Sequence, residues 1–496
     1  MSKSAEQLIA DYFDRAQMPS LPTGHFINGA FVAGDSGEKL QSFDPATGEA
    51  FAEFVAGNAT DVDKALVAAT KGFEVWRKTK PADRVAVLNR AAALMRQNHD
   101  LLSFMETLDS GKTLAEAEGD VAGSARLFEY YAGAADKLDG RSVPMGPDQM
   151  AWTVREPVGV TAHIIPWNYP TSTFVRGVAP ALAAGCSVVA KPAETTPFTA
   201  LMIAELLSEA GLPDGVVNVV TGLGGDAGAP LVVDPRVKHV TFTGSVATGV
   251  NVMQAVAPNV TRLTLELGGK SPLIALSDCD VEAAAEGALW AIFSNSGQIC
   301  SAGSRLIVHR DIHDALMDKL LTRAKGLTVG HGLRNPDMGA INSQLHLDRV
   351  CAHVERARAR GCNIVTGGNV MTDPETGKGW FFEPTIIDDL TQDDPAVQEE
   401  IFGPVLAVQV VDSDEEALQA ANGTEYGLVT GIYSRDISRA LRLARDVDAG
   451  QISINDYWAG GIELPFGGNG KSGFGREKGW EGLDAYTKFK SITVKL

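Results

Sequence analysis

Cys300 is the residue of this sequence whose neighbours best suit a nucleophile. It lies in the segment SNSGQICSAGSR, where Gly297 allows close backbone approach and the small residues Ser301, Ala302 and Gly303 leave room around the sulfur. A catalytic cysteine must be partly exposed and able to form a thiolate. The alternative is a cysteine that only fills the core, which is the commoner use of this residue. No triad of the serine-hydrolase or papain type can be recognised around Cys300.

Two further residues could assist a cysteine nucleophile. Glu266 lies in LELGGKSP, within an apolar run and ahead of two glycines, so we expect its carboxyl group to be desolvated. Desolvation raises a carboxyl pKa toward the range of a general base. Asn168, in PWNYP, lies between prolines and aromatic residues, and its amide can donate a hydrogen bond to a developing oxyanion. The alternatives are an exposed glutamate on an edge strand and an asparagine that caps a turn.

Two glycine-containing segments have features of a phosphate-binding turn. The segment GLGGDA at 222–227, which includes Gly224, fits G-x-G-x-x-A, but no suitable acid ends a strand about 20 residues later. Its alternative is a surface turn. In FTGSVATG at 242–249, a strand ends in Gly244 and Ser245 and a helix follows. Backbone N–H groups at a helix start favour a phosphate, so the second segment is the better candidate.

Lys191 and Glu194, in KPAE, come just after the end of another expected strand. A carboxylate at such a place can accept hydrogen bonds from ribose hydroxyls and would repel a 2′-phosphate. If this segment contacts a dinucleotide, Glu194 therefore favours NAD over NADP as the ligand. The alternative is a pair of solvated surface charges, which is the usual role of Lys and Glu.

Seven motifs occur together and in order: PWNYP, KPAE, FTGS, LELGGKSP, GQIC, EEIFGPV at 399–405 and PFGGNGKSGFGRE at 465–477. In this combination the sequence resembles the NAD(P)-dependent aldehyde dehydrogenases, and the resemblance covers essentially all of the 496 residues. The spacing of 34 residues from Glu266 to Cys300 also fits that family.

The resemblance implies a reaction in which Cys300 attacks the aldehyde carbon to form a thiohemiacetal, which becomes a thioester after hydride passes to the nicotinamide. Asn168 and the Cys300 backbone N–H would hold the oxyanion, and Glu266 would activate the water that hydrolyses the thioester. Glu477 completes the expected catalytic set, and no metal is expected. The residues implied to contact NAD are Ile165, Pro166, Trp167, Lys191, Glu194, Gly224, Phe242, Gly244, Ser245, Leu267, Glu400 and Phe402.

The sequence departs from the family pattern eight residues after Asn168, where Arg176 and Gly177 replace an aromatic residue and a lysine. The missing lysine puts a proton relay through it in doubt and leaves Glu477 without its usual neighbour. Arginine at this position resembles branches that oxidise semialdehydes, hydroxyaldehydes or aromatic aldehydes. Our hypothesis is that Arg176 reaches the substrate tunnel and binds a carboxylate or another polar acceptor. The alternative is that Arg176 pairs with an internal acid.

Aromatic residues are also expected along the substrate tunnel, where they suit an aromatic ring or a quaternary ammonium group. Parts of the chain, such as TGLGGDAGAPLV and GQICSAGSRLIVH, resemble betaine- and aminoaldehyde-oxidising enzymes, so that substrate class stays open. The acid-rich helix of that branch is only partly present, with Asp120 but with Gly123 near a second expected acid. Besides Arg176, the expected tunnel residues are Tyr169, Phe293, Trp458 and Phe466, with Phe174 and Tyr457 as further candidates.

Alternating strands and helices are needed to position these residues. Helical periodicity covers residues 61–98 and again 114–138. From Gly159 onward the runs GVTAHII, SVVAKP, GVVNVVTG and VKHVTFTGS alternate with helical segments, and SPLIAL, SRLIVH and PVLAVQVV continue the alternation after Ser271. We therefore predict an α/β fold with two doubly wound parallel-sheet domains, a Rossmann-like cofactor domain and a catalytic domain.

Two segments fall outside this alternation. Residues 141–157 predict a hairpin that projects from the body, and Ser491 to Lys495 predict a C-terminal strand. We expect an NAD-binding domain of residues 1–140 and 158–266, a catalytic domain of residues 267–470, and an oligomerisation element of residues 141–157 and 484–496. The resemblance implies a homodimer or homotetramer that assembles through this element.

Composition narrows the possible partners. The chain has 43 basic and 62 acidic residues, and its net charge of −19 disfavours nucleic acids and anionic membrane surfaces. Five cysteines, none in a C-x-x-C pattern, indicate neither a disulfide framework nor a zinc site. The N-terminal segment lacks a signal-peptide pattern, and no uncharged apolar stretch reaches about 18 residues. We expect a cytoplasmic protein that acts on a small-molecule aldehyde.

Two other classes are alternatives to hydrolytic aldehyde oxidation. The first is a non-catalytic NAD-binding scaffold with the same fold, which the joint presence of Cys300, Glu266 and Asn168 argues against. The second is a CoA-acylating dehydrogenase, in which CoA takes the acyl group. Such an enzyme needs no water-activating base, so Glu266 favours hydrolysis.

Overall fold

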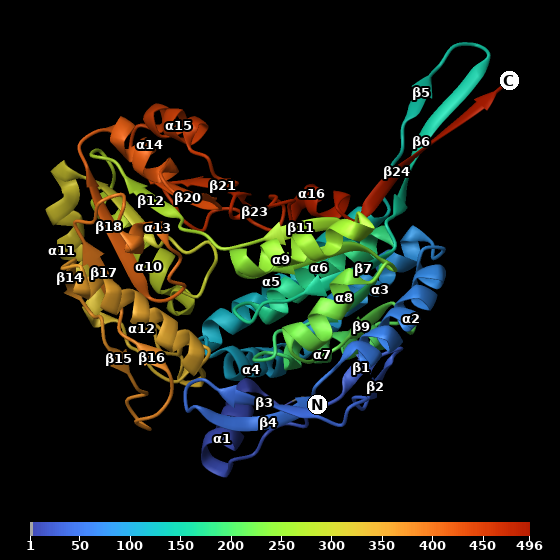
Figure 1. The fold of residues 1–496 in the computed structure, drawn as a ribbon, viewed down its shortest axis with the longest axis horizontal. Coiled ribbons are helices and arrows are strands. Elements are labelled where there is room, and N and C mark those ends of the chain that lie inside the picture. The colour runs from blue at the N-terminus through green and yellow to red at the C-terminus, as the bar shows by residue number, and fades with distance from the viewer. Residues whose placement is uncertain (1–2) are drawn as a thin grey trace.

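The computed structural model describes residues 3–496, and an eight-stranded sheet forms the middle of the larger of its two parts (Figure 1). The strand order is β2-β1-β9-β8-β7-β10-β11-β23. The central strands are parallel, as predicted, whereas antiparallel pairs occur at both edges. The strands are β1 (His25–Ile27), β2 (Ala30–Val32), β7 (Val160–Ile164), β8 (Ser187–Lys191), β9 (Val217–Val219), β10 (Val237–Thr243), β11 (Arg262–Glu266) and β23 (Gly473–Phe474).

Helices cover both faces of this sheet because consecutive apolar side chains of a strand point to opposite faces. Val188 and Ala190 of β8 belong to one hydrophobic core, and Val189 between them belongs to another. The first core receives α3 (Pro81–Gln97), α5 (Leu114–Ala135), α6 (Pro170–Ala184) and α7 (Phe198–Glu209), and the second receives α2 (Ala59–Trp76), α8 (Ala229–Val233) and α9 (Val246–Val256).

A seven-stranded sheet of order β14-β17-β18-β13-β12-β20-β21 forms the middle of the other part. Leu306 and Val308 of β13 face one core, and Ile307 faces another, so this sheet is also doubly wound. Only β14 pairs antiparallel in it. Its strands are β12 (Pro272–Ala275), β13 (Arg305–His309), β14 (Asn363–Thr366), β17 (Thr385–Asp388), β18 (Val405–Val411), β20 (Val429–Tyr433) and β21 (Gln451–Ile454).

The helices around the second sheet divide between its two faces. One core includes residues of α10 (Val281–Phe293) and α11 (Arg310–Gly326), and the opposite core includes residues of α14 (Asp414–Asn422) and α15 (Ile437–Asp446). A further core beside the sheet includes α12 (Gln344–Ala359) and α13 (Pro395–Gln398). The predicted pair of doubly wound domains is therefore present.

Smaller elements complete the molecule. Near the N-terminus, α1 (Ala5–Arg15) packs against α4 (His99–Ser110) in a small core of its own. Three two-stranded sheets are formed by β3 (Lys39–Asp44) with β4 (Glu49–Val55), β15 (Val370–Met371) with β16 (Phe381–Phe382), and β19 (Tyr426–Gly427) with β22 (Asn469–Gly470).

A three-stranded arm projects from the body, as Figure 1 shows at the upper right. It consists of β5 (Ser142–Pro144), β6 (Gln149–Pro157) and β24 (Thr487–Lys495). β24 follows the short helix α16 (Gly479–Asp484) and pairs antiparallel with the whole of β6. The hairpin lies where the sequence predicts it, and the C-terminal strand begins four residues earlier than expected, at Thr487 instead of Ser491.

The structure corrects one local expectation and shows the conformation of one open segment. The helical periodicity of residues 61–98 covers two helices, because α2 ends at Trp76 and α3 begins at Pro81, and proline is favoured in the first turn of a helix. The segment with Gly224 forms a π-helical turn (Gly224–Gly228) that leads into α8.

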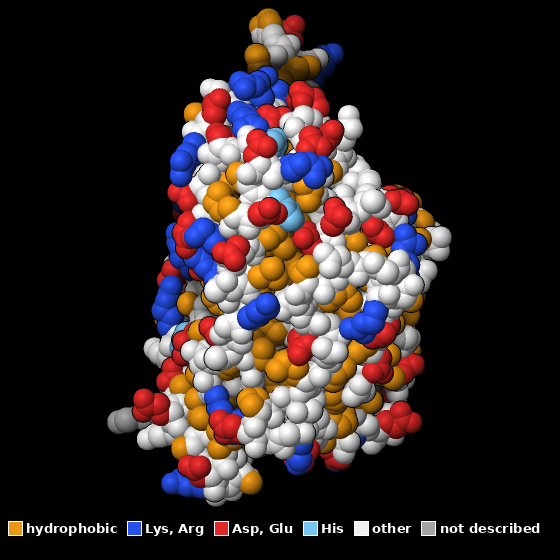
Figure 2. All heavy atoms as spheres, turned by 90° about the vertical axis from the view of Figure 1, so that its left-hand side faces the viewer, with side chains coloured by type: hydrophobic (Ala, Val, Ile, Leu, Met, Phe, Trp, Pro, Cys, Tyr) orange, Lys and Arg blue, Asp and Glu red, His pale blue; other side chains and the backbone are white. Residues whose placement is uncertain are grey.

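Acidic and basic side chains are interspersed on the face that carries the helices of the second sheet, with apolar side chains between them (Figure 2). This arrangement differs from the continuous basic surface that a nucleic acid requires. Among the residues that the structure describes, no helix is long and apolar enough to cross a membrane.

Candidate active site

Cys300 follows a tight turn that fixes its position. The turn η3 (Ser294–Gly297) ends in three residues with φ angles of 46°, 55° and 70°. At Gly297 the left-handed conformation coincides with close packing, because a Cβ there would overlap the carbonyl oxygen of Gly403. The Ser296 hydroxyl donates to a backbone carbonyl of a neighbouring loop at 2.8 Å. The sequence around the cysteine is therefore shaped by backbone constraints as well as by the need for space.

Cys300 lies where two cavities meet. The large cavity, of about 570 Å³, runs along the ends of the first sheet's strands and is lined by Gly244 and Glu266 among others. The small cavity, of about 230 Å³, is lined by aromatic and charged residues that include Tyr457 and Lys478. Among the residues that the structure describes, Cys300 is the one that lines both. A molecule in either cavity can therefore reach the same sulfur atom.

Glu266 is the last residue of β11 and lines the large cavity with a side chain that is 1% exposed. Within residues 3–496, neither of its carboxylate oxygens has a hydrogen-bond partner. Burial raises the pKa of Glu266, and the nearby charge of Glu477 adds to the rise. A carboxyl group with a raised pKa and two unengaged oxygens is suited to accept a proton from water.

The Cys300 thiol is also shifted by its surroundings. Burial raises the pKa of Cys300 to about 12, against the opposing effect of the Arg176 guanidinium. The carboxyl groups of Glu266 and Glu400 add to the rise. At neutral pH the sulfur therefore carries its proton, and its reactivity is expected to increase with pH.

Asn168 is held in an orientation that leaves a donor available. Its amide nitrogen donates to the Gln298 carbonyl at 2.9 Å, and the Asn295 amide donates to the Asn168 carbonyl at 3.3 Å. An amide nitrogen carries two N–H groups, so one hydrogen bond fixes the side chain and the second N–H is left for an oxyanion. Asn168 lines the large cavity together with Cys300.

The large cavity brings together eight of the twelve residues that the resemblance assigns to NAD: Pro166, Trp167, Glu194, Gly244, Ser245, Leu267, Glu400 and Phe402. The other four do not line it. Ile165 and Phe242 are buried, with the Phe242 ring against Gly244, and Gly224 lies in its π-helical turn. Lys191 is buried, and its Nζ lies 3.2 Å from a carboxylate oxygen of Glu194, which does line the cavity.

Several features of the large cavity suit a dinucleotide. Ser245 is the N-cap of α9, so backbone N–H groups of the first helical turn face the cavity where a phosphate is favoured. The carboxylate of Glu400 accepts a hydrogen bond from the Gly269 N–H at 2.9 Å, and burial raises the pKa of Glu400 to about 7. A Cβ at Gly268 would overlap this carboxylate, so the glycine makes its position possible.

Residues from the second domain complete the wall of the large cavity, and the sequence analysis did not identify them. The Trp167 ring lies 5.0 Å from the His346 ring and 5.4 Å from the Phe402 ring, and the His346 Nε2 lies 2.6 Å from the Phe402 carbonyl oxygen. No motif marks the missed residues, which lie in α12 or just before it. Those missed include Asn342, Ser343, His346, Arg349 and His353.

The small cavity contains Tyr169, Arg176, Trp458 and Phe466, four of the five residues predicted for the substrate. The fifth, Phe293, is fully buried in the core beneath α10 and lines neither cavity, and Phe174 is likewise buried in the first domain. Tyr457 does line the small cavity, and its hydroxyl donates to the Ser301 carbonyl at 2.7 Å.

Arg176 both reaches the small cavity and pairs with an internal acid, so each of the two hypotheses about this residue describes part of its environment. It lines the small cavity, and its Nε donates to a carboxylate oxygen of Glu477 at 2.5 Å. Glu477, which lines neither cavity, also accepts from the Thr241 hydroxyl at 3.0 Å, so it is not without a neighbour. A Cβ at Gly177 would overlap the His163 ring, which leaves no space for the lysine that the family pattern places there.

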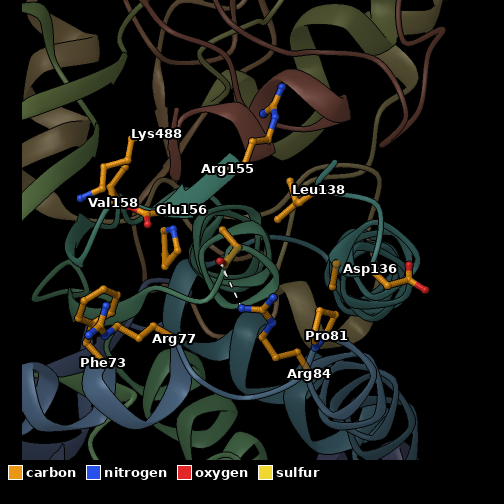
Figure 3. Close-up of a pocket in the computed structure, with 13 residues that line it drawn as sticks. Phe73, Arg77, Pro81, Arg84, Asp136, Leu138, Arg155, Glu156, Val158 and Lys488 are labelled. Atoms are coloured by element: carbon orange, nitrogen blue, oxygen red, sulfur yellow. Dashed lines mark hydrogen bonds between the residues drawn. The ribbon is translucent and has the colours of Figure 1, made fainter. Parts of the chain in front are cut away.

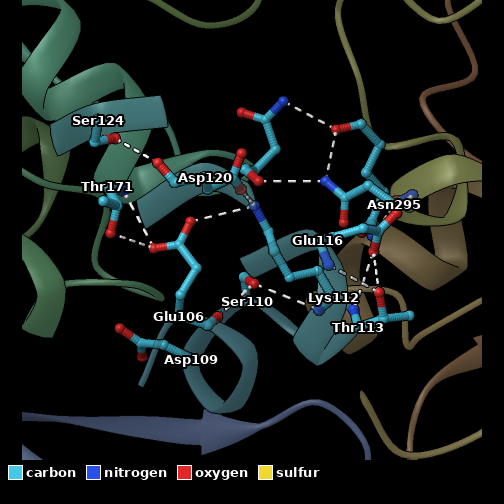
Figure 4. Close-up of polar contacts among 12 residues, drawn as sticks. Glu106, Asp109, Ser110, Lys112, Thr113, Glu116, Asp120, Ser124, Thr171 and Asn295 are labelled. Carbon is cyan, nitrogen blue, oxygen red and sulfur yellow. Dashed lines mark hydrogen bonds and ion pairs between the residues drawn. The ribbon is translucent and has the colours of Figure 1, made fainter. Parts of the chain in front are cut away.

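A buried charge network that was not predicted from the sequence surrounds Lys112 (Figure 4). The Lys112 Nζ lies 3.2 Å from Glu106 and 2.5 Å from Asp120, and 4.0 Å from the centre of the Tyr169 ring. Asp120 lines the small cavity, and so does Lys478, which lies near the C-terminal end of the chain. Neither lysine stands out in the sequence, because no local pattern marks a buried charge.

A third cavity, of about 410 Å³, lies at the base of the arm and is separate from Cys300. Arg84, Asp136, Arg155 and Lys488 are among its lining residues, but their charged ends point in different directions (Figure 3). Within the described part of the chain, no group of three or more His, Cys, Asp or Glu residues is arranged to hold a metal ion.

Solved structures with the same architecture include several dehydrogenases. An indole-3-acetaldehyde dehydrogenase from P. syringae, in complex with NAD⁺ and IAA, is 37% identical, has a TM-score of 0.96, and the match covers 99% of this chain and 100% of that one. An NAD-dependent aldehyde dehydrogenase from Sinorhizobium meliloti is 38% identical with a TM-score of 0.93, over 95% and 94% of the two chains. A betaine aldehyde dehydrogenase from Staphylococcus aureus, in complex with NAD⁺, is 37% identical with a TM-score of 0.94, over 96% and 95%.

The sequence itself matches the model of the aldehyde dehydrogenase family over residues 31–492. This range includes both cavities, the cysteine between them and most of the arm. The fold, the arrangement around Cys300 and the sequence match agree with one another, and this chain belongs to the aldehyde dehydrogenase family.

Proposed function

We propose that this protein catalyses the NAD-dependent oxidation of an aldehyde to a carboxylic acid. The observation that carries the proposal is the position of Cys300 at the junction of the two cavities. An aldehyde in the small cavity and a dinucleotide in the large cavity meet at this sulfur atom. The S. aureus and P. syringae relatives in complex with NAD⁺ support the choice of cofactor.

In the first step, the Cys300 thiolate attacks the carbonyl carbon and forms a thiohemiacetal. Because the resting sulfur is protonated, its proton passes to water in the cavities before the C–S bond forms. The negative charge that develops on the carbonyl oxygen is stabilised by the second N–H of Asn168 and by the Cys300 backbone N–H. The loss of hydride then leaves a thioester on Cys300.

In the second step, Glu266 takes a proton from water, which attacks the thioester and releases the carboxylic acid. Burial and the unengaged oxygens of Glu266 fit this role, because a carboxylate that has lost its solvation is a stronger base. The water needs space beside Cys300, and the large cavity contains both residues.

The chain's own residues fit a dinucleotide, which supplies the hydride acceptor when bound. Ser245 and the start of α9 suit its phosphates, and Trp167 and Phe402 suit the wall of its site. Glu194 is half-exposed at the edge of the cavity, where its charge favours a ribose with free hydroxyls over a 2′-phosphate. Glu400 would hold the ribose next to the reacting ring. We therefore propose NAD rather than NADP.

We propose that Glu477 and Arg176 are positioning residues, which influence the reaction through Glu266. Glu477 raises the pKa of Glu266, and its own charge is balanced by Arg176. Because Gly177 stands where the family pattern has a lysine, a proton relay through that lysine is absent, and the ion pair with Arg176 is the charged contact that Glu477 has instead.

We further propose a division of labour along the chain. Residues 1–140 and 158–266 would bind the cofactor, residues 267–470 would bind and convert the aldehyde, and residues 141–157 with 484–496 would join subunits into a homodimer or homotetramer. The arm that projects from the body supports the last assignment. Five cysteines without disulfides support a cytoplasmic location.

The test is NADH formation by the purified protein with benzaldehyde, succinic semialdehyde, lactaldehyde, betaine aldehyde and hexanal. We expect turnover of at least one class with NAD, weaker turnover with NADP, and complete loss in Cys300→Ala. Turnover by Cys300→Ala, or none by the unaltered protein, would contradict the proposal and favour a non-catalytic NAD-binding scaffold. Adding CoA distinguishes a third outcome, because acyl-CoA instead of free acid would identify an acylating enzyme.

Oxidation of betaine aldehyde or an aminoaldehyde is the second candidate. It is favoured by the S. aureus relative and by the Asp120 carboxylate at the small cavity. The same panel separates it from the semialdehyde, hydroxyaldehyde and aromatic classes.

A further inference from the structure

Lys478 has a fixed backbone and a side chain in the small cavity. It adopts φ of 58° immediately before α16, and its carbonyl oxygen accepts from the Gly482 N–H at 2.9 Å. The side chain is half-buried and lines the small cavity together with Cys300. Its ammonium group lies 5.2 Å from the centre of the Phe466 ring. Lys478 is therefore positioned by the fold at the substrate side of the reacting sulfur.

The other charged groups around the small cavity are already paired. Asp120 has the Lys112 ammonium at 2.5 Å, and Arg176 has the Glu477 carboxylate at 2.5 Å. Figure 4 shows Lys112 between the carboxylates of Glu106 and Asp120, and Lys112 itself does not line the cavity. By contrast, no described residue forms a hydrogen bond or an ion pair with the Lys478 ammonium. The cavity thus carries one positive charge that the protein does not balance by direct contact.

This imbalance has an energetic cost, because an ammonium group removed from water and left without an anion is poorly stabilised. Burial and the Arg176 charge lower the pKa of Lys478 to about 8, although Glu477, Cys300 and Asp120 oppose the change. The Phe466 ring offers a weak contact that it shares with Arg176, whose guanidinium carbon lies 4.9 Å from the ring centre. A ligand with a negative group would supply the missing partner.

We propose that Lys478 binds an anionic group of the substrate, so that the preferred substrates are aldehydes that carry a carboxylate away from the aldehyde carbon. The inference rests on the proposed oxidation of aldehydes and names its substrate class. It moves the expected anion contact from Arg176, which is held by Glu477, to the lysine beside it. Asp120 already has the Lys112 ammonium as a direct partner, whereas Lys478 has none, so Lys478 is the charged group that is free to pair with a ligand.

The first experiment compares substrates of similar size and different charge: succinic semialdehyde, butanal and betaine aldehyde, with NAD at a saturating level. We expect a KM for succinic semialdehyde that is about tenfold or more below that for butanal, and the highest KM for betaine aldehyde. Equal KM values for the acid and butanal, or a preference for betaine aldehyde, would overturn the inference. Either result would leave the proposed oxidation of aldehydes intact.

Variants at this position locate the charge that is responsible. In Lys478→Met the KM ratio between butanal and succinic semialdehyde should fall about tenfold, and Lys478→Arg should restore it in part. In Lys478→Glu the preference should move toward betaine aldehyde. Lys319→Met removes a lysine of the exposed face of α11 and should leave the ratio unchanged. A ratio that is the same in Lys478→Met and the unaltered enzyme would refute the role of this residue.

A binding measurement makes the inference testable even without turnover. Calorimetric titration of the unaltered protein with succinate and with butanoate compares two acids that differ by one carboxylate. We expect tighter binding of succinate, by about tenfold, and loss of the difference in Lys478→Met. Equal affinities in the unaltered protein would contradict the anion site, whereas absent turnover with retained selectivity would contradict only the proposed reaction.

Discussion

The Cys300 thiol is protonated at neutral pH and is then a weak nucleophile, because burial raises its pKa to about 12. The fraction of thiolate, and with it the alkylation rate, should increase about tenfold per pH unit between pH 7 and 10 in the protein without substrate. The measurement is the rate of iodoacetamide labelling of the Cys300 peptide by mass spectrometry. Labelling of the exposed model thiol glutathione in the same tube corrects for the reagent. A rate that levels off below pH 8 would show that the thiolate forms in the resting protein.

Glu266 should be needed for the hydrolysis of the thioester. In Glu266→Gln the amide keeps the shape but accepts no proton, so kcat should fall by about 10²- to 10⁴-fold. The acyl group should then remain on Cys300 and be visible as an increase in intact mass after rapid quenching. The matched control is Glu282→Gln, which removes an exposed carboxylate at the start of α10 and should leave kcat unchanged. Normal kcat in Glu266→Gln would assign the water activation to another group.

Residue-scale prediction from the sequence succeeded where a residue's neighbours in the chain determine its environment. Glu266 is desolvated as its flanking leucines indicate, and Asn168 is held rigidly as its prolines indicate. It failed where the partner is distant, since Arg176 and Glu477 are 301 residues apart and their ion pair forms only in the fold. The unpaired charge of Lys478 could not be predicted from the sequence either. It is unpaired because the fold brings the neighbouring charged residues into contact with other partners.

The turn before Cys300 is the element whose geometry the reaction depends on most directly. Gly297→Ala would place a Cβ against the Gly403 carbonyl in a backbone region that favours glycine, so the turn must shift. We expect kcat/KM to fall at least about tenfold, and Tm to fall by a few degrees, which thermal unfolding and NADH assays would measure. The control is Gly326→Ala at the end of α11, where a Cβ has open space. Equal activity of the two variants would show that the turn tolerates displacement of Cys300.

Element boundaries show what periodicity can and cannot predict. The strands and helices of both sheets follow from their apolar runs, because a strand buried on both faces is apolar at every position. The break at Pro81 was missed because the apolar residues on each side of it have helical spacing, although residues 77–80 carry none. Phe293 was assigned to the tunnel because α10 is apolar on most sides, and only packing decides which face meets the core.

At the scale of the whole molecule, the site depends on how two domains meet. The 34 residues from Glu266 to Cys300 leave the first sheet at the end of β11, form β12 and α10 of the second, and return to the junction. Gly269 allows the start of this segment to pack against Cys300 at its end, because a Cβ at position 269 would overlap the Cys300 carbonyl oxygen. The large cavity therefore has walls from both domains, which explains why its residues from α12 could not be found by motifs near the first sheet.

The projecting arm carries exposed apolar side chains, which a monomeric protein does not explain. The arm exposes Met150, Phe489 and Val494 to solvent, at 55%, 61% and 41%, and Leu496 just after β24 is 70% exposed. Apolar side chains on a projecting sheet lose their contact with water when another copy covers them, and homo-oligomers bury such surfaces symmetrically. We therefore expect light scattering to give a mass that is a multiple of 52.4 kDa.

Met150 and Val494 are cross-strand partners, so their side chains share one face of the arm. Replacing both by lysine should place like charges on that face and lower the mass toward 52.4 kDa, with the fold of each subunit kept. Gln149→Lys adds charge to the opposite face and serves as the control. A monomeric unaltered protein, or an assembly that survives both lysines, would place the subunit contact elsewhere. Since Cys300 and both cavities lie in the body, the dissociated variant should still oxidise aldehydes, which separates assembly from chemistry.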